Sequence, residues 1–238
     1  MKRWQVGAAA ALLVGLAVLV VAVKLGDGAS DNPSTAAAPI GPMTNVRVAC
    51  AGDSLTFGEG VATHDNYPSR LQTLLGIGYI VGNFGRPGAA VGAISNLPYT
   101  STEEYKRALD FRPDVVLVML GTNDALPPND SPELEAQFIK DYESILRSFV
   151  NLPTRPKVYA VTPPGVYGDS LRAKEAILAN IIRPGIRQAA ADLNVQLVDI
   201  ANLLGDNPNN FQNDGVHLSP AGFEVMSQAL FKVVSTVG

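Results

Sequence analysis

The sequence predicts a three-layer α/β fold, in which a parallel sheet of five strands carries helices on both faces. Two observations support this prediction. Five short apolar runs lack the polar–apolar alternation of a half-exposed strand, so they fit strands that are buried on both faces. Segments with apolar residues at helical spacing lie between these runs. Strands that alternate with helices in this way are typical of a parallel sheet.

An N-terminal apolar segment precedes this fold. Lys2 and Arg3 are followed by an apolar run from Val6 to Val23, which is close to the length that a helix needs to cross a bilayer. We therefore expect a transmembrane helix within residues 1–25 that anchors the protein in the membrane. The alternative is a signal segment that is cleaved. In both cases the rest of the chain is expected to be extracytoplasmic.

Residues 26–44 are rich in Gly, Ala, Ser and Pro and show no apolar period. Such a composition predicts a disordered linker, so the folded domain is expected to span residues 45–238. No internal repeat or second domain is evident in it. Its predicted strands are Val46–Gly52, Tyr79–Phe84, Asp114–Leu120, Lys157–Thr162 and Val195–Asp199.

Five helices are predicted between and after these strands. Several of them begin with a capping residue followed by Pro at the first helical position, as in Ser131-Pro132 and Ser219-Pro220. Pro184 is expected to kink the longest helix, because proline cannot donate the hydrogen bond of a helix interior. The predicted helices are Tyr67–Leu75, Thr102–Asp110, Pro132–Val150, Ser170–Leu193 and Pro220–Val234.

Composition narrows the class of function. The 238 residues carry a net charge of -4, which argues against a nucleic-acid partner, since such proteins present a basic face. The chain contains one Cys and two His, too few for a dedicated zinc site, and no cofactor is predicted. Cys50 lies inside the first strand and is expected to be a small core residue. The oligomeric state is left open.

Ser54 follows the first predicted strand, at the edge of a parallel sheet where ligands bind. A serine needs a base to act as a nucleophile, and the base needs a group that orients it. His217 and Asp214, three residues apart before the last helix, fit these roles, since both side chains can project from one tight turn. His64, beside Asp65, is the alternative base.

Two further positions fall at the same predicted edge. Asn123 follows the third strand and can donate an amide N–H, and Gly88 follows the second strand and can present a backbone N–H. Together with the backbone N–H of Ser54 they would form an oxyanion hole for acyl transfer. Asp53 and Asp124 are predicted to support these groups from adjacent positions.

Four sequence blocks carry these residues, and together they resemble the SGNH hydrolases, also called GDSL esterases and lipases. The blocks are Gly52-Asp53-Ser54-Leu55, Asn83–Gly88 with Gly88, Gly121-Thr122-Asn123-Asp124 and Asp214-Gly215-Val216-His217. The resemblance extends over most of the predicted domain. It implies a flavodoxin-like sheet with strand order 2-1-3-4-5 and ester hydrolysis without a metal.

The expected substrate is a short acyl ester. The segment Lys157–Tyr167 resembles family branches that act on acetylated sugars, and Tyr99, Tyr167 and Phe211 are candidates for an aromatic platform under a sugar ring. We therefore expect deacetylation of a carbohydrate or another small ester. The alternatives are a short-chain lipase or thioesterase, an acyltransferase with the same residues, and a tethered carbohydrate-binding domain without turnover.

Overall fold

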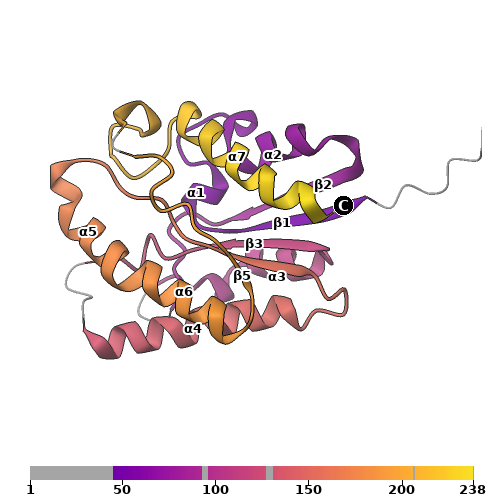
Figure 1. The fold of residues 1–238 in the computed structure, drawn as a ribbon, viewed down its shortest axis with the longest axis horizontal. Coiled ribbons are helices and arrows are strands. Elements are labelled where there is room, and N and C mark those ends of the chain that lie inside the picture. The colour runs from indigo at the N-terminus through magenta and orange to yellow at the C-terminus, as the bar shows by residue number, and fades with distance from the viewer. Residues whose placement is uncertain (1–44, 93–95, 127–130, 206, 238) are drawn as a thin grey trace, which may run out of the picture. The chain divides into compact units, whose positions relative to one another are not determined.

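The computed structural model describes residues 45–92, 96–126, 131–205 and 207–237. Five parallel strands form one sheet in the order β2-β1-β3-β4-β5 (Figure 1), which confirms the predicted sheet. Each observed strand end lies within one residue of the predicted end. The strands are β1 (Val46–Gly52), β2 (Tyr79–Gly85), β3 (Val115–Met119), β4 (Lys157–Val161) and β5 (Gln196–Val198).

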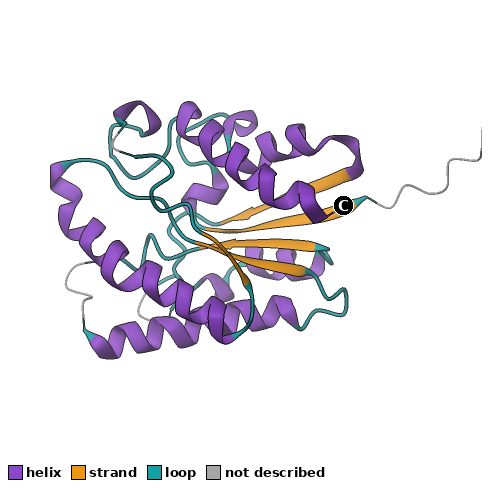
Figure 2. Ribbon diagram, viewed as in Figure 1, coloured by secondary structure: helices purple, strands orange, loops and turns teal. Residues whose placement is uncertain are grey.

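Helices cover both faces of the sheet (Figure 2). One face packs against α2 (Tyr67–Leu75) and α7 (Pro220–Val234), and the other against α3 (Glu103–Asp110), α4 (Pro132–Val150) and α6 (Arg183–Asp192). Successive residues of a strand point to opposite faces. The central strand β1 therefore contributes Val48 and Cys50 to one hydrophobic core, and Ala49 and Ala51 to the other.

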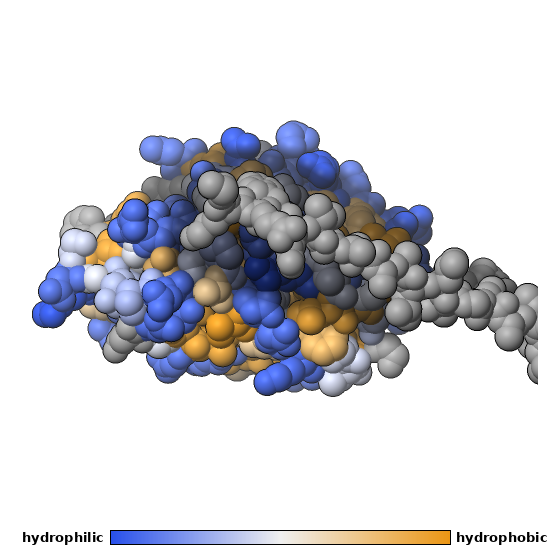
Figure 3. Space-filling model, turned by 90° about the horizontal axis from the view of Figure 1, so that it is seen from above, coloured by the Kyte–Doolittle hydropathy of each residue, from blue (hydrophilic) through white to orange (hydrophobic). Residues whose placement is uncertain are grey.

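The edge strands differ from the prediction that all five strands are buried on both faces. Strands β1, β3 and β4 are almost fully buried, but Ile80 in β2 is 42% exposed and Leu197 in β5 is 39% exposed. Each edge strand has one neighbour instead of two, so covering helices protect it less. Figure 3 shows hydrophobic and hydrophilic surface interspersed on the face that it displays.

The predicted long helix with a kink at Pro184 is divided in the structure. It consists of α5 (Arg172–Ile177), a π-helical turn (Leu178–Ile182) and α6, in which Pro184 occupies the first turn. Proline has no N–H, and its ring collides with the carbonyl one turn earlier in a regular α-helix. A wider π-turn ahead of the proline relieves this conflict, so the irregularity precedes Pro184.

The predicted caps at Ser131 and Ser219 are present in the structure. The hydroxyl of Ser131 accepts a hydrogen bond from the backbone N–H of Leu134 at 3.3 Å, and that of Ser219 from Gly222 at 3.2 Å. These bonds satisfy donors that a helix leaves unpaired in its first turn. The capping residues therefore fix where α4 and α7 begin.

The predicted membrane segment at residues 1–25 and the predicted linker at residues 26–44 lie outside the described residues. Within the described ranges, no helix combines the length and the apolar character that a membrane span requires. The anchored, extracytoplasmic location therefore stays a prediction.

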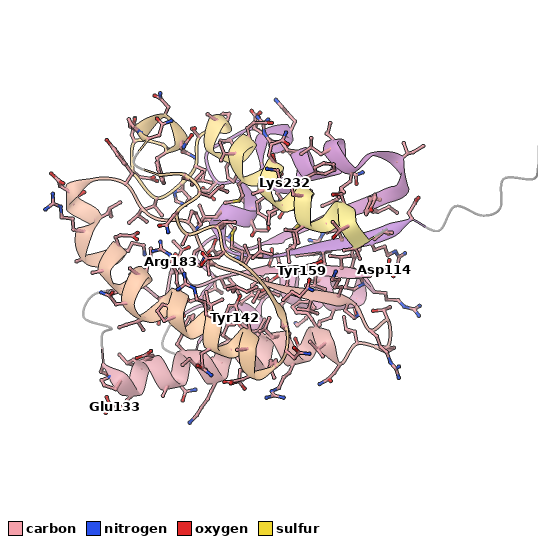
Figure 4. All side chains as sticks on the ribbon, in the orientation of Figure 1. Asp114, Glu133, Tyr142, Tyr159, Arg183 and Lys232 are labelled. Atoms are coloured by element: carbon pink, nitrogen blue, oxygen red, sulfur yellow. The ribbon has the colours of Figure 1, made fainter. Side chains whose placement is uncertain are left out.

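All five strands run in the same direction, so their carboxyl ends share one edge of the sheet. In Figure 4 this edge lies on the side of Arg183, and Asp114, which precedes β3, marks the opposite edge. Ligands bind beyond the carboxyl edge in open α/β sheets. The loops after the strands are therefore the place to look for a functional site.

Candidate active site

Ser54 is separated from the end of β1 by Asp53 alone and occupies the first position of the short helix α1 (Ser54–Phe57). This helix was not expected from the sequence. Asp53 caps it, since one carboxylate oxygen of Asp53 accepts the backbone N–H of Leu55 at 2.9 Å. The backbone N–H of Ser54 lies in the first turn, where a helix supplies no carbonyl partner. The cap thus fixes the orientation of Ser54 and leaves its N–H available to a ligand.

The structure brings His217 and Asp214 to Ser54. Nε2 of His217 lies 2.9 Å from Oγ of Ser54, and Nδ1 of His217 lies 2.6 Å from Oδ2 of Asp214. The other carboxylate oxygen of Asp214 accepts the backbone N–H groups of Val216 and His217, both at 2.9 Å. A carboxylate at Nδ1 favours the tautomer with the proton on Nδ1. Nε2 then has a lone pair for the hydroxyl proton of Ser54.

The turn between Asp214 and His217 depends on Gly215. Its φ of +70° belongs to the left-handed region, and a Cβ atom built there would lie 1.9 Å from the carbonyl oxygen of Tyr167. The backbone of Tyr167 donates to the carbonyl of Gly215 at 2.7 Å. The loop after β4 therefore holds the Asp214–His217 turn, which requires glycine at this position.

Two opposing effects set the pKa of Asp214. Partial burial acts to raise the pKa of this carboxyl, but the hydrogen bonds from His217 and from two backbone N–H groups outweigh burial and hold the pKa below its usual range. Asp214 is therefore ionised at neutral pH. An ionised carboxylate can orient the imidazole and stabilise the imidazolium that forms when His217 takes up a proton.

Asn123 lies in the turn after β3, and its amide is anchored to the loop after β2. Nδ2 of Asn123 donates to the carbonyl of Ala89 at 2.8 Å. An amide nitrogen carries two N–H bonds, so this contact leaves a second one for a ligand. Gly88, the neighbour of Ala89, has a φ of +78°. The Asn123–Ala89 bond therefore joins the two loops that carry the predicted oxyanion donors.

Asp53 and Asp124 are acids with unusual pKa values beside this site. Burial raises the pKa of Asp53 to about 6, and the nearby Asp124 adds to this effect. Burial likewise raises the pKa of Asp124 to about 6, although the backbone N–H groups of Val91 and Gly92 donate to its carboxylate and lower the pKa. Both acids thus lie in the interior around Ser54 and Asn123, where charge is poorly solvated.

Two residues singled out in the sequence lie elsewhere. The side chain of His64 is 83% exposed and lies 3.5 Å from Asp65, while His217 is the histidine that contacts Ser54. Tyr99 is fully buried and its hydroxyl donates to the carbonyl of Phe84 at 2.7 Å, so it cannot form an exposed platform. Tyr99 begins a short 3₁₀ turn (Tyr99–Ser101), where the sequence has no periodic pattern that would signal burial.

Lys174 was missed in the sequence because it belongs to no motif. It lies in α5, and its ammonium donates to the carbonyls of Thr122 and Ala125, the residues that flank Asn123 and Asp124. Within the described ranges, no group of three or more His, Cys, Asp or Glu side chains is placed to hold a metal ion. Cys50 is fully buried, as expected, and burial raises the pKa of its thiol to about 12.

Comparison with known proteins agrees with this geometry. Residues 50–225 match the GDSL-like lipase/acylhydrolase family. An acetylxylan esterase from Xylanibacter ruminicola is 28% identical over 204 residues, which cover 78% of this chain and 42% of the relative. The chain thus spans less than half the length of this curated relative.

Solved structures resemble the fold. A carbohydrate acetylesterase from Sinorhizobium meliloti aligns with a TM-score of 0.67 at 18% identity, covering 82% of this chain and 100% of the other. The aryl esterase of M. smegmatis aligns with a TM-score of 0.66 at 22% identity, covering 81% and 100%. These likenesses support the α/β fold, and the sequence match covers most of the described domain. The chain therefore belongs to the GDSL-like lipase/acylhydrolase family, a family of carboxylic-ester hydrolases.

Proposed function

We propose that this protein is a serine esterase that removes short acyl groups, above all acetyl, from a carbohydrate. The observation that carries the proposal is the hydrogen-bonded chain from Ser54 through His217 to Asp214. A serine, a histidine and an ionised carboxylate in this order form the constellation that activates a hydroxyl for attack on a carbonyl.

The proposed reaction has two steps. In the first, Oγ of Ser54 attacks the ester carbonyl while His217 accepts the hydroxyl proton, and then gives that proton to the alcohol that leaves. In the second, water attacks the acyl-enzyme, His217 accepts a proton from it, and the acid leaves as the proton returns to Ser54. Asp214 stays ionised throughout and stabilises the imidazolium.

The negative charge that develops on the carbonyl oxygen needs donors. The backbone N–H groups of Ser54 and Gly88 and the amide of Asn123 are the proposed three. The contact of Asn123 with Ala89 supports this assignment, because it couples the positions of two donors. Preorganised donors of this kind commonly contribute about 10²–10³-fold each to the rate.

The names of the relatives support an acetylated carbohydrate as substrate. The relative with 28% identity is an acetylxylan esterase, and one similar structure is a carbohydrate acetylesterase. An aryl esterase is also among the similar structures. The acyl part common to the first two is an acetyl group, so we place acetyl esters first.

A polar hollow next to the Asp214–His217 turn suits the alcohol part of such a substrate. It measures about 500 Å³ and is lined by residues 166–169, Arg172 and Glu175, a size in the usual range for small-ligand sites. Tyr167 in its wall stacks on Phe211 with ring planes 18° apart and centroids 5.7 Å apart, and is itself 38% exposed. An exposed aromatic face with charged groups around it fits a sugar ring.

The test of the reaction is the loss of turnover in Ser54→Ala. We expect hydrolysis of p-nitrophenyl acetate to fall by at least about 10⁴-fold, since the nucleophile is lost, with an unchanged melting temperature. Ser235→Ala, at an exposed serine, is the matched control and should retain full activity. A Ser54→Ala protein that retains more than a few per cent of activity would refute the role of Ser54.

The substrate class is tested separately with a panel of esters. We expect kcat/KM to fall from p-nitrophenyl acetate to the butyrate and the octanoate, and acetylated xylan to be deacetylated. A preference for octanoate, or turnover of aryl esters without any release of acetate from acetylated sugars, would reject the carbohydrate assignment and leave the Ser54 mechanism in place.

A further inference from the structure

The turn that carries Asn123 is held by a lysine from a distant helix. Nζ of Lys174 donates to the carbonyl oxygen of Thr122 at 2.5 Å and to that of Ala125 at 3.2 Å. These two carbonyls lie on either side of Asn123 and Asp124 along the chain. Lys174 is half-buried in α5, more than 45 residues further along the sequence. One ammonium group therefore closes the turn across both of its ends.

Other hydrogen bonds connect the same turn to the loop after β2. Asn123 donates to the carbonyl of Ala89, and the carboxylate of Asp124 accepts the backbone N–H groups of Val91 and Gly92. These bonds fix the turn relative to the loop that carries Gly88. The bonds from Lys174 fix it relative to α5. Residues 121–125 are thus held from two directions.

Partial burial of the Lys174 ammonium is unfavourable in itself. An ammonium ion loses hydration when it is buried, and burial lowers the pKa of Lys174, although Asp53 and Asp124 oppose this effect. A neutral side chain of similar length would avoid this penalty. A charged donor to a backbone carbonyl is, however, a strong hydrogen bond. Two such bonds on one turn are suited to holding it rigidly.

We propose that Lys174 is a positioning residue for oxyanion stabilisation, because its two hydrogen bonds hold the Thr122–Ala125 turn so that the Asn123 amide meets the developing negative charge. The inference rests on the proposed esterase function. Lys174 acts through Asn123 and has no role as an acid, base or nucleophile. Small displacements of a positioning group can lower a rate by as much as about 10²-fold.

The experiment is a double-mutant cycle with Lys174→Met and Asn123→Ala, measured with p-nitrophenyl acetate. Methionine keeps the length of the side chain but removes the charge and the donors. We expect Lys174→Met to lower kcat by about 10–100-fold with KM within about twofold. In the Asn123→Ala background the same change should lower kcat/KM by less than about threefold, because the group that Lys174 positions is gone.

Controls separate positioning from folding. Lys140→Met, at an exposed lysine of α4, is the matched control and should leave kcat unchanged. Lys174→Arg retains the charge and the donors, so it should recover most of the activity that Lys174→Met loses. If Lys174→Met does not fold, Lys174→Ala takes its place in the cycle, because alanine also removes the charge and the donors and favours a helix.

Two outcomes would overturn the inference. One is a folded Lys174→Met or Lys174→Ala enzyme with unchanged kcat. The other is a loss of equal size in the presence and absence of the Asn123 amide, which would show that Lys174 acts independently of it. Failure of the proposed function is distinguishable, since the parent enzyme would then show no Ser54-dependent turnover at all.

Discussion

Asp53 provides the sharpest test of the electrostatics beside Ser54. Asp53 is 1% exposed, and only one of its carboxylate oxygens has a hydrogen-bond partner among the described residues. The hydroxyl of Thr122 lies close enough to lower the pKa of Asp53 but outside hydrogen-bonding geometry, and it too has no partner in the described part of the chain. We predict that Asp53→Asn stabilises the folded protein at neutral pH.

The magnitude follows from the pKa of Asp53. Burial raises it from 3.8 to about 6, a difference that corresponds to about 3 kcal/mol. Between these two pH values the folded protein binds the proton more tightly than the unfolded chain, so the free energy of unfolding falls as pH rises. Above pH 6 the folded protein has lost the full amount of about 3 kcal/mol from its free energy of unfolding. Asparagine carries no charge, so it avoids the loss, and its amide can donate to Thr122.

The assay is thermal and urea unfolding of the parent protein and Asp53→Asn between pH 4.5 and pH 8. We expect the variant to be more stable by about 1 kcal/mol at pH 4.5, where the unfolded carboxyl has already ionised, and by up to about 3 kcal/mol above pH 6. That advantage corresponds to an increase in melting temperature of about 6–12 °C for a chain of this size. Asp110→Asn, at an exposed acid of α3, is the control and should show no such dependence.

Two results would refute this reasoning. Unfolding curves of Asp53→Asn that stay parallel to those of the parent at every pH would show that Asp53 does not titrate in this range. If the difference in unfolding free energy between Asp53→Asn and the parent is smaller at pH 8 than at pH 5, the predicted pH dependence has the wrong sign. The ionised carboxylate would then stabilise the fold.

Three further predictions concern the site and the N-terminus. Asp214→Asn should lower kcat/KM for p-nitrophenyl acetate by about 10²–10⁴-fold, since an amide favours the wrong imidazole tautomer; a loss below tenfold would contradict the role of Asp214. Gly215→Ala should lower the unfolding free energy by about 1–3 kcal/mol because of its left-handed φ and the contact with Tyr167, and an unchanged melting temperature would argue against the turn geometry. Full-length protein should stay in the membrane fraction after a high-salt wash, whereas release by salt alone would contradict an anchor at residues 1–25.

The sheet could be predicted from the sequence because its signals are local. Each strand is a short apolar run with turn residues on both sides, so its limits can be found within a few positions. The turn from Asp214 to His217 is equally local, because a spacing of three places both side chains on one side of a tight turn. His217 and Ser54 are 163 residues apart in the sequence. Their proximity could be predicted only because the carboxyl ends of parallel strands share one edge of the sheet.

Other features depend on contacts that the sequence does not display. The burial of Tyr99 results from its hydroxyl reaching the carbonyl of Phe84, and the exposure of Leu197 from the position of β5 at the edge of the sheet. The π-turn before α6 depends on how a proline is accommodated within a packed helix. Lys174 resembles any lysine of an amphipathic helix, and its partners are backbone carbonyls, which have no sequence signature.

The buried charges around Ser54 form one connected system, and this has a consequence for the proposed mechanism. Asp124 raises the pKa of Asp53, Lys174 lowers the pKa of Asp124, and the two acids in turn favour the charged form of Lys174. A fold selected for stability alone would place neutral residues at these positions, since unpaired buried charge is unfavourable. All three groups border the turn or the cap that positions a proposed oxyanion donor. We therefore expect the more stable Asp53→Asn protein to be the less active one, so that stability and kcat change in opposite directions at this position.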